Sequence, residues 1–215
     1  MAEDLDALVR RVDPDRWLSS RFVADAAARA DLITLYALDH ELVRIPQIVR
    51  DPLMGEIRMT WWREGLEEIA DGKSPRSHAV LQAVAASALP PTALAALAEA
   101  RLGDLDGLKT GEAALAHADA TDGLLMALAA RRLSAKATAD QVKQAARAVA
   151  LARTDGAAAL AALGASRAEL AGLPVAAFPA VAHATLARPY ARGATPGELE
   201  KRLRILMAVL TGRLG

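Results

Sequence analysis

The segment Leu35–Leu66 reads LYALDHELVRIPQIVRDPLMGEIRMTWWREGL, and a short Arg50-Asp51-Pro52 turn divides it into two stretches of helix-forming residues. In the second stretch the apolar residues recur at steps of three and four, which is the spacing of one helix face. They are Met59, Trp62, Leu66 and Ile69. A second face carries Glu56, Thr60, Arg63 and Glu67. The pattern predicts two antiparallel neighbouring helices, with Trp62 in a core and Trp61 on roughly the opposite side of its helix.

Composition narrows the class of protein. The chain has 215 residues, and 53% of them are hydrophobic, which is enough to bury a sizeable core. Lysine and arginine number 26, as do aspartate and glutamate, and the two signs are interspersed. This balance argues against a nucleic-acid surface, which needs clustered basic charge. The lack of cysteine excludes disulfides, thiolate metal sites and cysteine nucleophiles.

Two stretches bear on localisation. The first residues, MAEDLDALVRR, are acidic and amphipathic, unlike a signal or transit peptide. The most apolar stretch, Leu170–Ala187, is interrupted by Pro174, Pro179 and His183, so we expect no transmembrane segment. The sequence favours a cytoplasmic protein and leaves open a peripheral contact with the inner membrane.

Helix-forming residues dominate the whole chain, and no segment keeps the alternation of a β-strand. The expected helices cover Glu3–Val12, Asp15–Ala28, Ala30–Val49, Pro52–Ala70, Ser77–Ala88, Pro91–Leu102, Glu112–Arg131, Ala139–Leu163, Val175–Ala187 and Gly197–Arg213. Breaks are expected at Asp71-Gly72 and Pro90-Pro91, a kink at Pro46, and a helix start at Thr195-Pro196. No linker is long enough to separate two domains, so residues 1–215 are expected to form a single all-α domain.

Five landmarks follow one another along the chain: LYALDHELVRI, WWREGLEEIADG, SHAVLQAV, EARLGDL and LAHADATDGLLMALA. Their order, from about Phe22 to Leu128, resembles the squalene/phytoene synthase family. The resemblance implies an isoprenoid (terpenoid) synthase-like helical bundle around a central cavity, with a shortened carboxyl-terminal part. Family positions are matched by Arg63, His78, Arg101 and Asp104. The implied cavity-lining candidates are Tyr36, Val43, Gln47, Trp62, His117 and Gly123.

The resemblance also predicts that the family's metal chemistry is lost. Active members condense isoprenoid diphosphates with Mg²⁺ held by two DxxxD motifs, whose paired carboxylates share one helix face. Counting from Tyr36, the first pair falls at Val43 and Gln47, and neither is a carboxylate. Where the second pair belongs, Asp155 is followed four positions on by Ala159. We therefore expect no catalytic residue, no metal site and no cofactor, with Mg²⁺ needed only if its ligands have moved.

Other acidic residues do not replace these motifs. Asp119 and Asp122 lie one turn apart near His117, but without a third acidic helix the pair is expected to be an exposed polar face. Two further pairs are spaced two residues apart, which does not place both carboxylates on one helix face. They are Asp104 with Asp106 and Asp39 with Glu41. The sequence also has no zinc-binding HExxH, nucleophile elbow or phosphate loop.

The run Leu35–Arg63 most resembles the branch of the family that includes the mitochondrial complex I assembly factor, whose implied role is assembly or binding. The first hypothesis is thus a degenerate synthase that binds an isoprenoid-like lipid or assembles a partner, such as a membrane-associated protein complex. The second is an active prenyltransferase with relocated Mg²⁺ ligands. The third is a purely structural helical bundle. The missing carboxylates favour the first, because several phosphate charges are hard to neutralise without metal.

Overall fold

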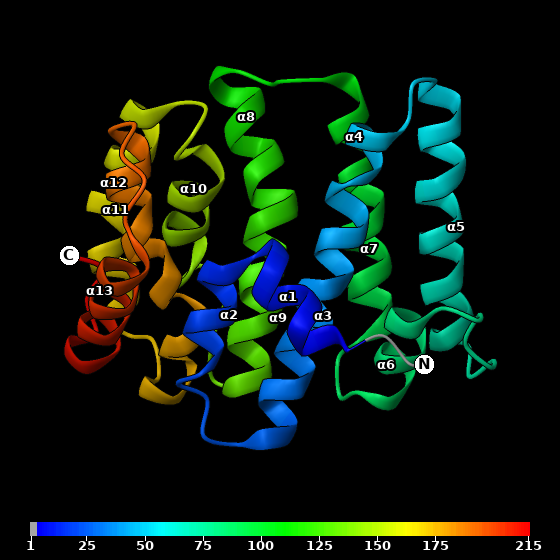
Figure 1. The fold of residues 1–215 in the computed structure, drawn as a ribbon, viewed down its shortest axis with the longest axis horizontal. Coiled ribbons are helices and arrows are strands. Elements are labelled where there is room, and N and C mark those ends of the chain that lie inside the picture. Colours follow the sequence, from blue (N-terminus) through cyan, green and yellow to red (C-terminus); the bar gives the residue numbers. More distant parts are fainter. Residues whose placement is uncertain (1–3) are drawn as a thin grey trace.

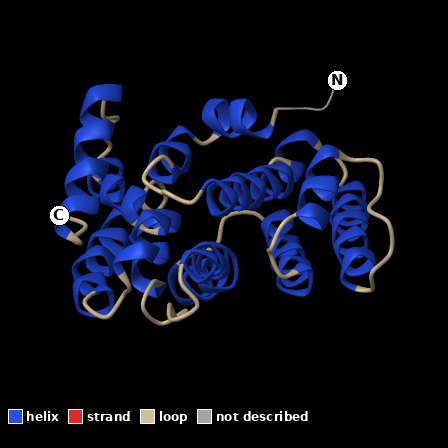
Figure 2. Cartoon of the chain, turned by 90° about the horizontal axis from the view of Figure 1, so that it is seen from below, coloured by secondary structure: helices blue, strands red, loops and turns tan. Residues whose placement is uncertain are grey.

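The computed structural model describes residues 4–215, and every regular element in that range is helical (Figures 1 and 2). The α-helices are α1 (Leu5–Val12), α2 (Pro14–Ser20), α3 (Ala26–Val43), α4 (Ile45–Ile48), α5 (Pro52–Ala70), α6 (Ala79–Ala86), α7 (Pro91–Arg101), α8 (Gly111–Ala118), α9 (Leu124–Leu133), α10 (Lys143–Leu151), α11 (Gly156–Leu170), α12 (Ala187–Ala191) and α13 (Glu198–Thr211). Three short 3₁₀ segments join them: η1 (Leu102–Asp106), η3 (Val175–Ala180) and η4 (Ala182–Leu186). A π-helical turn, η2 (Asp119–Gly123), links α8 to α9. The all-α prediction is confirmed.

Local signals fix the ends of α5 and α7 where the sequence predicts them. The Asp51 carboxylate accepts a hydrogen bond from the Leu53 amide at 3.0 Å, which caps the start of α5. Helix α5 ends at Ala70, and Gly72 continues the chain with a left-handed φ of 77°. Helix α7 begins at Pro91, in the first turn, where no backbone donor is needed.

The junctions around α3 differ from the prediction. The expected helix Asp15–Ala28 is wrong, because α2 stops at Ser20, whose hydroxyl donates back to the Trp17 carbonyl at 2.7 Å. Helix α3 starts only at Ala26, after its Asp25 cap. The expected helix Ala30–Val49 is also interrupted. It ends at Val43, and Pro46 lies in the first turn of the separate helix α4.

Long predicted helices in the carboxyl half are also divided. The expected helix Ala139–Leu163 becomes α10 and α11, because the Asp155 side chain caps Ala158 at 3.0 Å and starts a new helix. The expected helix Val175–Ala187 is instead the 3₁₀ segments η3 and η4, with Pro179 inside η3. The last helix starts at Glu198, two residues after the proline expected to open it.

Helix α5 does not pack along α3 as predicted. Its long neighbour is α7, and between α3 and α5 lie α4, α6 and α7, each of which contacts both helices (Figure 1). Helix α7 buries Leu94, Leu97 and Ala98, so a face of leucines and small alanines meets the buried stripe of α5. The break after Val43 removes the continuous hairpin on which the prediction depended.

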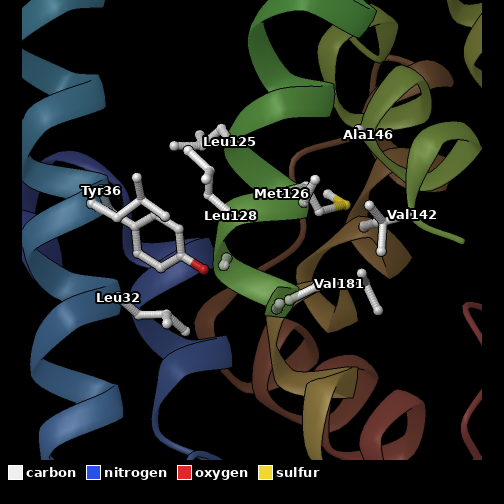
Figure 3. Close-up of a cluster of buried hydrophobic side chains, with 14 of the residues drawn as sticks. Leu32, Tyr36, Leu125, Met126, Leu128, Val142, Ala146 and Val181 are labelled. Atoms are coloured by element: carbon white, nitrogen blue, oxygen red, sulfur yellow. The ribbon is translucent and has the colours of Figure 1, made fainter. Parts of the chain in front are cut away.

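The interior between α3, α9 and α10 is filled by side chains (Figure 3). Tyr36 and Leu32 of α3 point towards Leu125 and Leu128 of α9, while Met126 on the other side of α9 faces α10. Helix α9 is buried on almost all sides, from Leu125 to Ala130. Even so, no helix within residues 4–215 is long and apolar enough to cross a bilayer.

The tandem tryptophans of α5 lie in different environments, as predicted. Trp62 is 5% exposed and belongs to the core, whereas Trp61 is 38% exposed. The His78 ring packs edge-on against Trp62, with ring centroids 4.7 Å apart. The apolar stripe read from the sequence therefore marks the buried face of α5.

Candidate functional site

A ring of four charged side chains, each at most 15% exposed, joins helices that are distant in sequence. Arg16 of α2 donates to Asp39 of α3 at 3.2 Å and to Asp122 of η2 at 2.8 Å. Arg101 of α7 donates to the other oxygen of Asp39 at 2.7 Å and lies 3.6 Å from the second oxygen of Asp122. Two arginines and two aspartates thus alternate around the ring, and their charges cancel.

Because little water reaches the ring, the ionisation of each of its side chains depends on the others. Asp39 is 4% exposed and Arg101 is 6% exposed, so each charge depends on its partners for solvation. Burial opposes the charged form of the guanidinium groups, but the surrounding carboxylates dominate and raise the pKa of Arg16 and of Arg101. For Asp122, burial raises the pKa, yet Arg101 and Arg16 lower it below its ordinary value. Arg16, Arg101 and Asp122 therefore stay ionised at neutral pH.

The π-helical turn η2 sets the direction of the two aspartates predicted to form an exposed acidic face. That prediction is wrong. Asp122 turns inward into the ring, and the Asp119 carboxylate is bound by both Nε and Nη2 of Arg147 on α10, each at 2.6 Å. The turn is anchored by the Thr121 hydroxyl, which donates to the His117 carbonyl at 2.7 Å. Such π-turns are frequent at functional sites.

A surface pocket of about 220 Å³ opens beside the ring. Arg101 and Asp122 form part of its wall, together with Asp104 and His117, whose side chains contact each other. A side chain at position 103 would crowd the His117 ring at 3.2 Å, so Gly103 makes room for that histidine. The pocket brings together the family-matched residues Arg101 and Asp104 and the cavity candidate His117.

The remaining sequence candidates lie elsewhere. Tyr36 is buried in the filled core, and its hydroxyl has no partner among residues 4–215. Val43 is half-buried and Gln47 is exposed. We expected both to face the interior, and for Gln47 this is wrong, because α3 ends at Val43 and the four-residue spacing no longer follows one helix. Gly123 closes the π-turn.

The other family-matched positions lie around α5. Arg63 is half-exposed and lies 3.4 Å from Glu99 on α7. The His78 ring packs edge-on against both tryptophans and lines a small hollow beside them. These residues therefore lie away from the charge ring and its pocket.

The donor set of the ring does not fit Mg²⁺. The carboxylates of Asp39 and Asp122 already accept from guanidinium groups, and a magnesium ion requires several free oxygen ligands. Within residues 4–215, no group of three or more histidine or acidic side chains is arranged to hold a metal. The ring links α2, α3, α7 and η2 through ion pairs, and its Arg101 side chain lines the pocket.

The helices and the site together define a class, an all-α bundle in which an arginine–aspartate ring joins distant helices. A family model described as squalene/phytoene synthase matches residues 9–155, and the chain belongs to that family. Comparisons with curated proteins and with solved structures give no match. The match includes the whole ring and every cavity candidate.

Proposed function

We propose that this protein is a non-catalytic member of its family that binds a partner protein of a membrane-associated complex. The observation that carries the proposal is an apolar surface on α4 and α5, called the Trp61 patch. It consists of Ile48, Leu53, Met54, Ile57 and Trp61, with exposed fractions between 38% and 58%. Clusters of exposed apolar side chains are typical of interaction sites.

The geometry of the Trp61 patch suits a helix. Leu53, Ile57 and Trp61 are spaced by four residues, so their side chains form one ridge along α5. Hollows of about 360 Å³ and 170 Å³ lie against Trp61. A ridge with hollows beside it matches the way side chains of one helix pack into the grooves of another.

Charge around the patch indicates the chemistry of the partner. The larger hollow is lined by the carboxylates of Glu56 and Glu64. The smaller hollow is lined by Arg44, Arg58 and Glu41, and Arg76 lies over the Trp61 ring. An apolar helix with a lysine or arginine beside its apolar face complements the larger hollow. The whole patch lies in the run Leu35–Arg63, which resembles the assembly branch of the family, and this supports a role in assembly.

The interior gives less support to an isoprenoid ligand. A prenyl chain there would have to displace Tyr36 and Leu128, which are packed against their neighbours (Figure 3). The charge ring likewise supports loss of metal-dependent transfer, because its carboxylates are already neutralised by arginine. Partner binding needs neither an open cavity nor a metal.

Binding to a designed helix tests the patch. We expect a labelled synthetic helix with a leucine stripe flanked by lysines to bind the wild-type protein in an anisotropy titration. Ile57→Glu should weaken this binding by about tenfold or more, because it places a charge on the central ridge. The matched control is Leu203→Glu on α13, an equally exposed leucine, 52% against 52% for Ile57.

Two results of that titration would contradict the proposal: no binding of the lysine-flanked helix, or an equal loss of affinity in both variants. A third would come from a parallel titration with phosphatidylglycerol vesicles, if the protein bound them in preference to the helix. The last would indicate a membrane surface in place of a protein partner. A glutamate-flanked helix of the same leucine stripe should bind more weakly than the lysine-flanked one.

A product assay tests the loss of catalysis separately. Incubation with farnesyl or geranylgeranyl diphosphate and Mg²⁺ is expected to give no condensed product by mass spectrometry, because residues 4–215 contain no cluster of carboxylates arranged to hold the metal. Restoring one pair with Val43→Asp and Gln47→Asp is expected to leave the protein inactive, since the second pair is also missing. Product from the wild-type protein would instead establish the active prenyltransferase, with metal ligands in new places.

A further inference from the structure

A second pocket lies at the other end of the molecule from the Trp61 patch. It has a volume of about 290 Å³ and is walled by α2, η4, α12, α13 and the turn after α10. Its polar lining includes Asp15, Arg153, His183, Tyr190 and Lys201, none of which belongs to the pocket at the charge ring. Four of its lining residues lie beyond Asp155, where the match to the family ends: His183, Ala187, Tyr190 and Lys201.

His183 lies in the wall of this pocket without a hydrogen-bond partner. Its side chain is 5% exposed, and neither ring nitrogen has a partner within residues 4–215. Burial, together with the nearby Arg16 charge, lowers its pKa to about 4, so the ring is neutral at pH 7. A neutral imidazole offers one donor and one acceptor, and leaving both unused in a buried position is costly. The ring is therefore suited to a polar ligand group.

The Asp15 carboxylate contacts two other polar groups of the pocket. Asp15 accepts a hydrogen bond from the Tyr190 hydroxyl at 2.6 Å and lies 2.9 Å from the Lys201 ammonium. Lys201 is 8% exposed, yet its pKa is raised, because Asp15 and Tyr190 outweigh the effect of burial. The ammonium keeps its charge, and besides Asp15 it contacts Tyr190 and lies 4.0 Å from Glu198.

Arg153 supplies a second cation at the same place. Its guanidinium lies over the Tyr190 ring, 3.9 Å from the centroid, and no carboxylate among residues 4–215 pairs with it. Arg16 also lines the pocket, but it is held by Asp13 and by the two aspartates of the charge ring, and Lys201 is paired with Asp15. Arg153 is thus the lining cation that remains for an anionic group.

We propose that this pocket binds a small anionic metabolite through a phosphate or carboxylate group. Arg153 holds the anionic group, and His183 forms a hydrogen bond with a polar group on the body of the ligand. Stacking on Tyr190 holds the Arg153 guanidinium in place, which reduces the entropy lost on binding. The volume suits a molecule of a few carbon atoms and is too small for a prenyl diphosphate.

Titration with three probes tests the site. Inorganic phosphate, glycerol 3-phosphate and succinate are added to the wild-type protein labelled with ¹⁵N-histidine at pH 7.5. We expect a saturable shift of the His183 ring signals with at least one probe, and the preferred probe distinguishes phosphate from carboxylate. Arg153→Gln should weaken that binding by about tenfold, as expected for loss of a charged hydrogen bond.

The matched control is Arg167→Gln, which removes an exposed arginine from α11 outside this pocket. It should leave the affinity unchanged, and thermal unfolding should show that both variants remain folded. The proposal is overturned if none of the probes saturates, if the His183 signals do not move, or if the two variants weaken binding equally. Because no step involves the Trp61 patch, failure here leaves the partner-binding proposal intact, and the reverse also holds.

Discussion

Arg101→Met is expected to lower the free energy of unfolding by about 3–5 kcal/mol, because it removes one of the two arginines that hold the buried Asp39 carboxylate and leaves the ring with an unbalanced negative charge. Asp39 is 4% exposed and receives its shortest ring hydrogen bond from Arg101, at 2.7 Å. Methionine fills a similar volume, so loss of packing contributes little. Urea denaturation followed by circular dichroism measures the difference, provided that wild type and variant unfold in one transition.

Two further variants separate charge from packing. Arg101→Met combined with Asp39→Leu removes one charge of each sign and should recover most of the lost stability, since an apolar pair can replace a buried ion pair at little cost. Arg63→Met removes a half-exposed arginine that lies 3.4 Å from Glu99 and should cost about 1 kcal/mol or less. If Arg101→Met costs no more than Arg63→Met, the ring contributes little to stability.

The sequence alone does not predict the charge ring, because its four residues are far apart along the chain. Asp39 and Arg101 are 62 residues apart, and Arg16 and Asp122 are 106 apart. Helical spacing relates only residues three or four positions apart. It therefore shows that Asp39 and Glu41 do not share a helix face, but it cannot pair Asp39 with an arginine on another helix. One signal was available, because Asp39 lies between Tyr36 and Leu42 on α3, where the neighbouring side chains are apolar. A charge on an apolar face predicts a buried partner.

Rules based on neighbouring residues correctly predicted the features that depend on a single helix. The stripe of Met59, Trp62 and Leu66, and the ends of α5 at Asp51 and Gly72, need only the residues of that helix. The pairing of α5 with α7 was missed, because a choice between apolar faces depends on how all the helices fit together. The π-turn at Asp119–Gly123 was also missed, since the contacts that accompany it include an arginine from α10.

Trp62→Ala is expected to destabilise the fold by about 3–5 kcal/mol, the usual cost of truncating a large buried aromatic side chain. The substitution removes the ring that packs against both His78 and Trp61, with centroids at 4.7 Å and 5.3 Å. It also opens a cavity between α5 and the core, beside the fully buried Met59 and Leu66. Neither neighbour can fill that space without leaving its own contacts.

Trp61→Ala is the matched control, because it removes the same side chain from the next position of the same helix. Trp61 is 38% exposed, and its loss should cost about 1 kcal/mol, mainly from the edge-on contact with Trp62. The two variants should also separate in function, since Trp61→Ala removes part of the patch and should weaken binding of the lysine-flanked helix. Trp62→Ala should weaken it only as far as the protein unfolds. Equal losses of stability would mean that α5 does not bury the face marked by its apolar stripe.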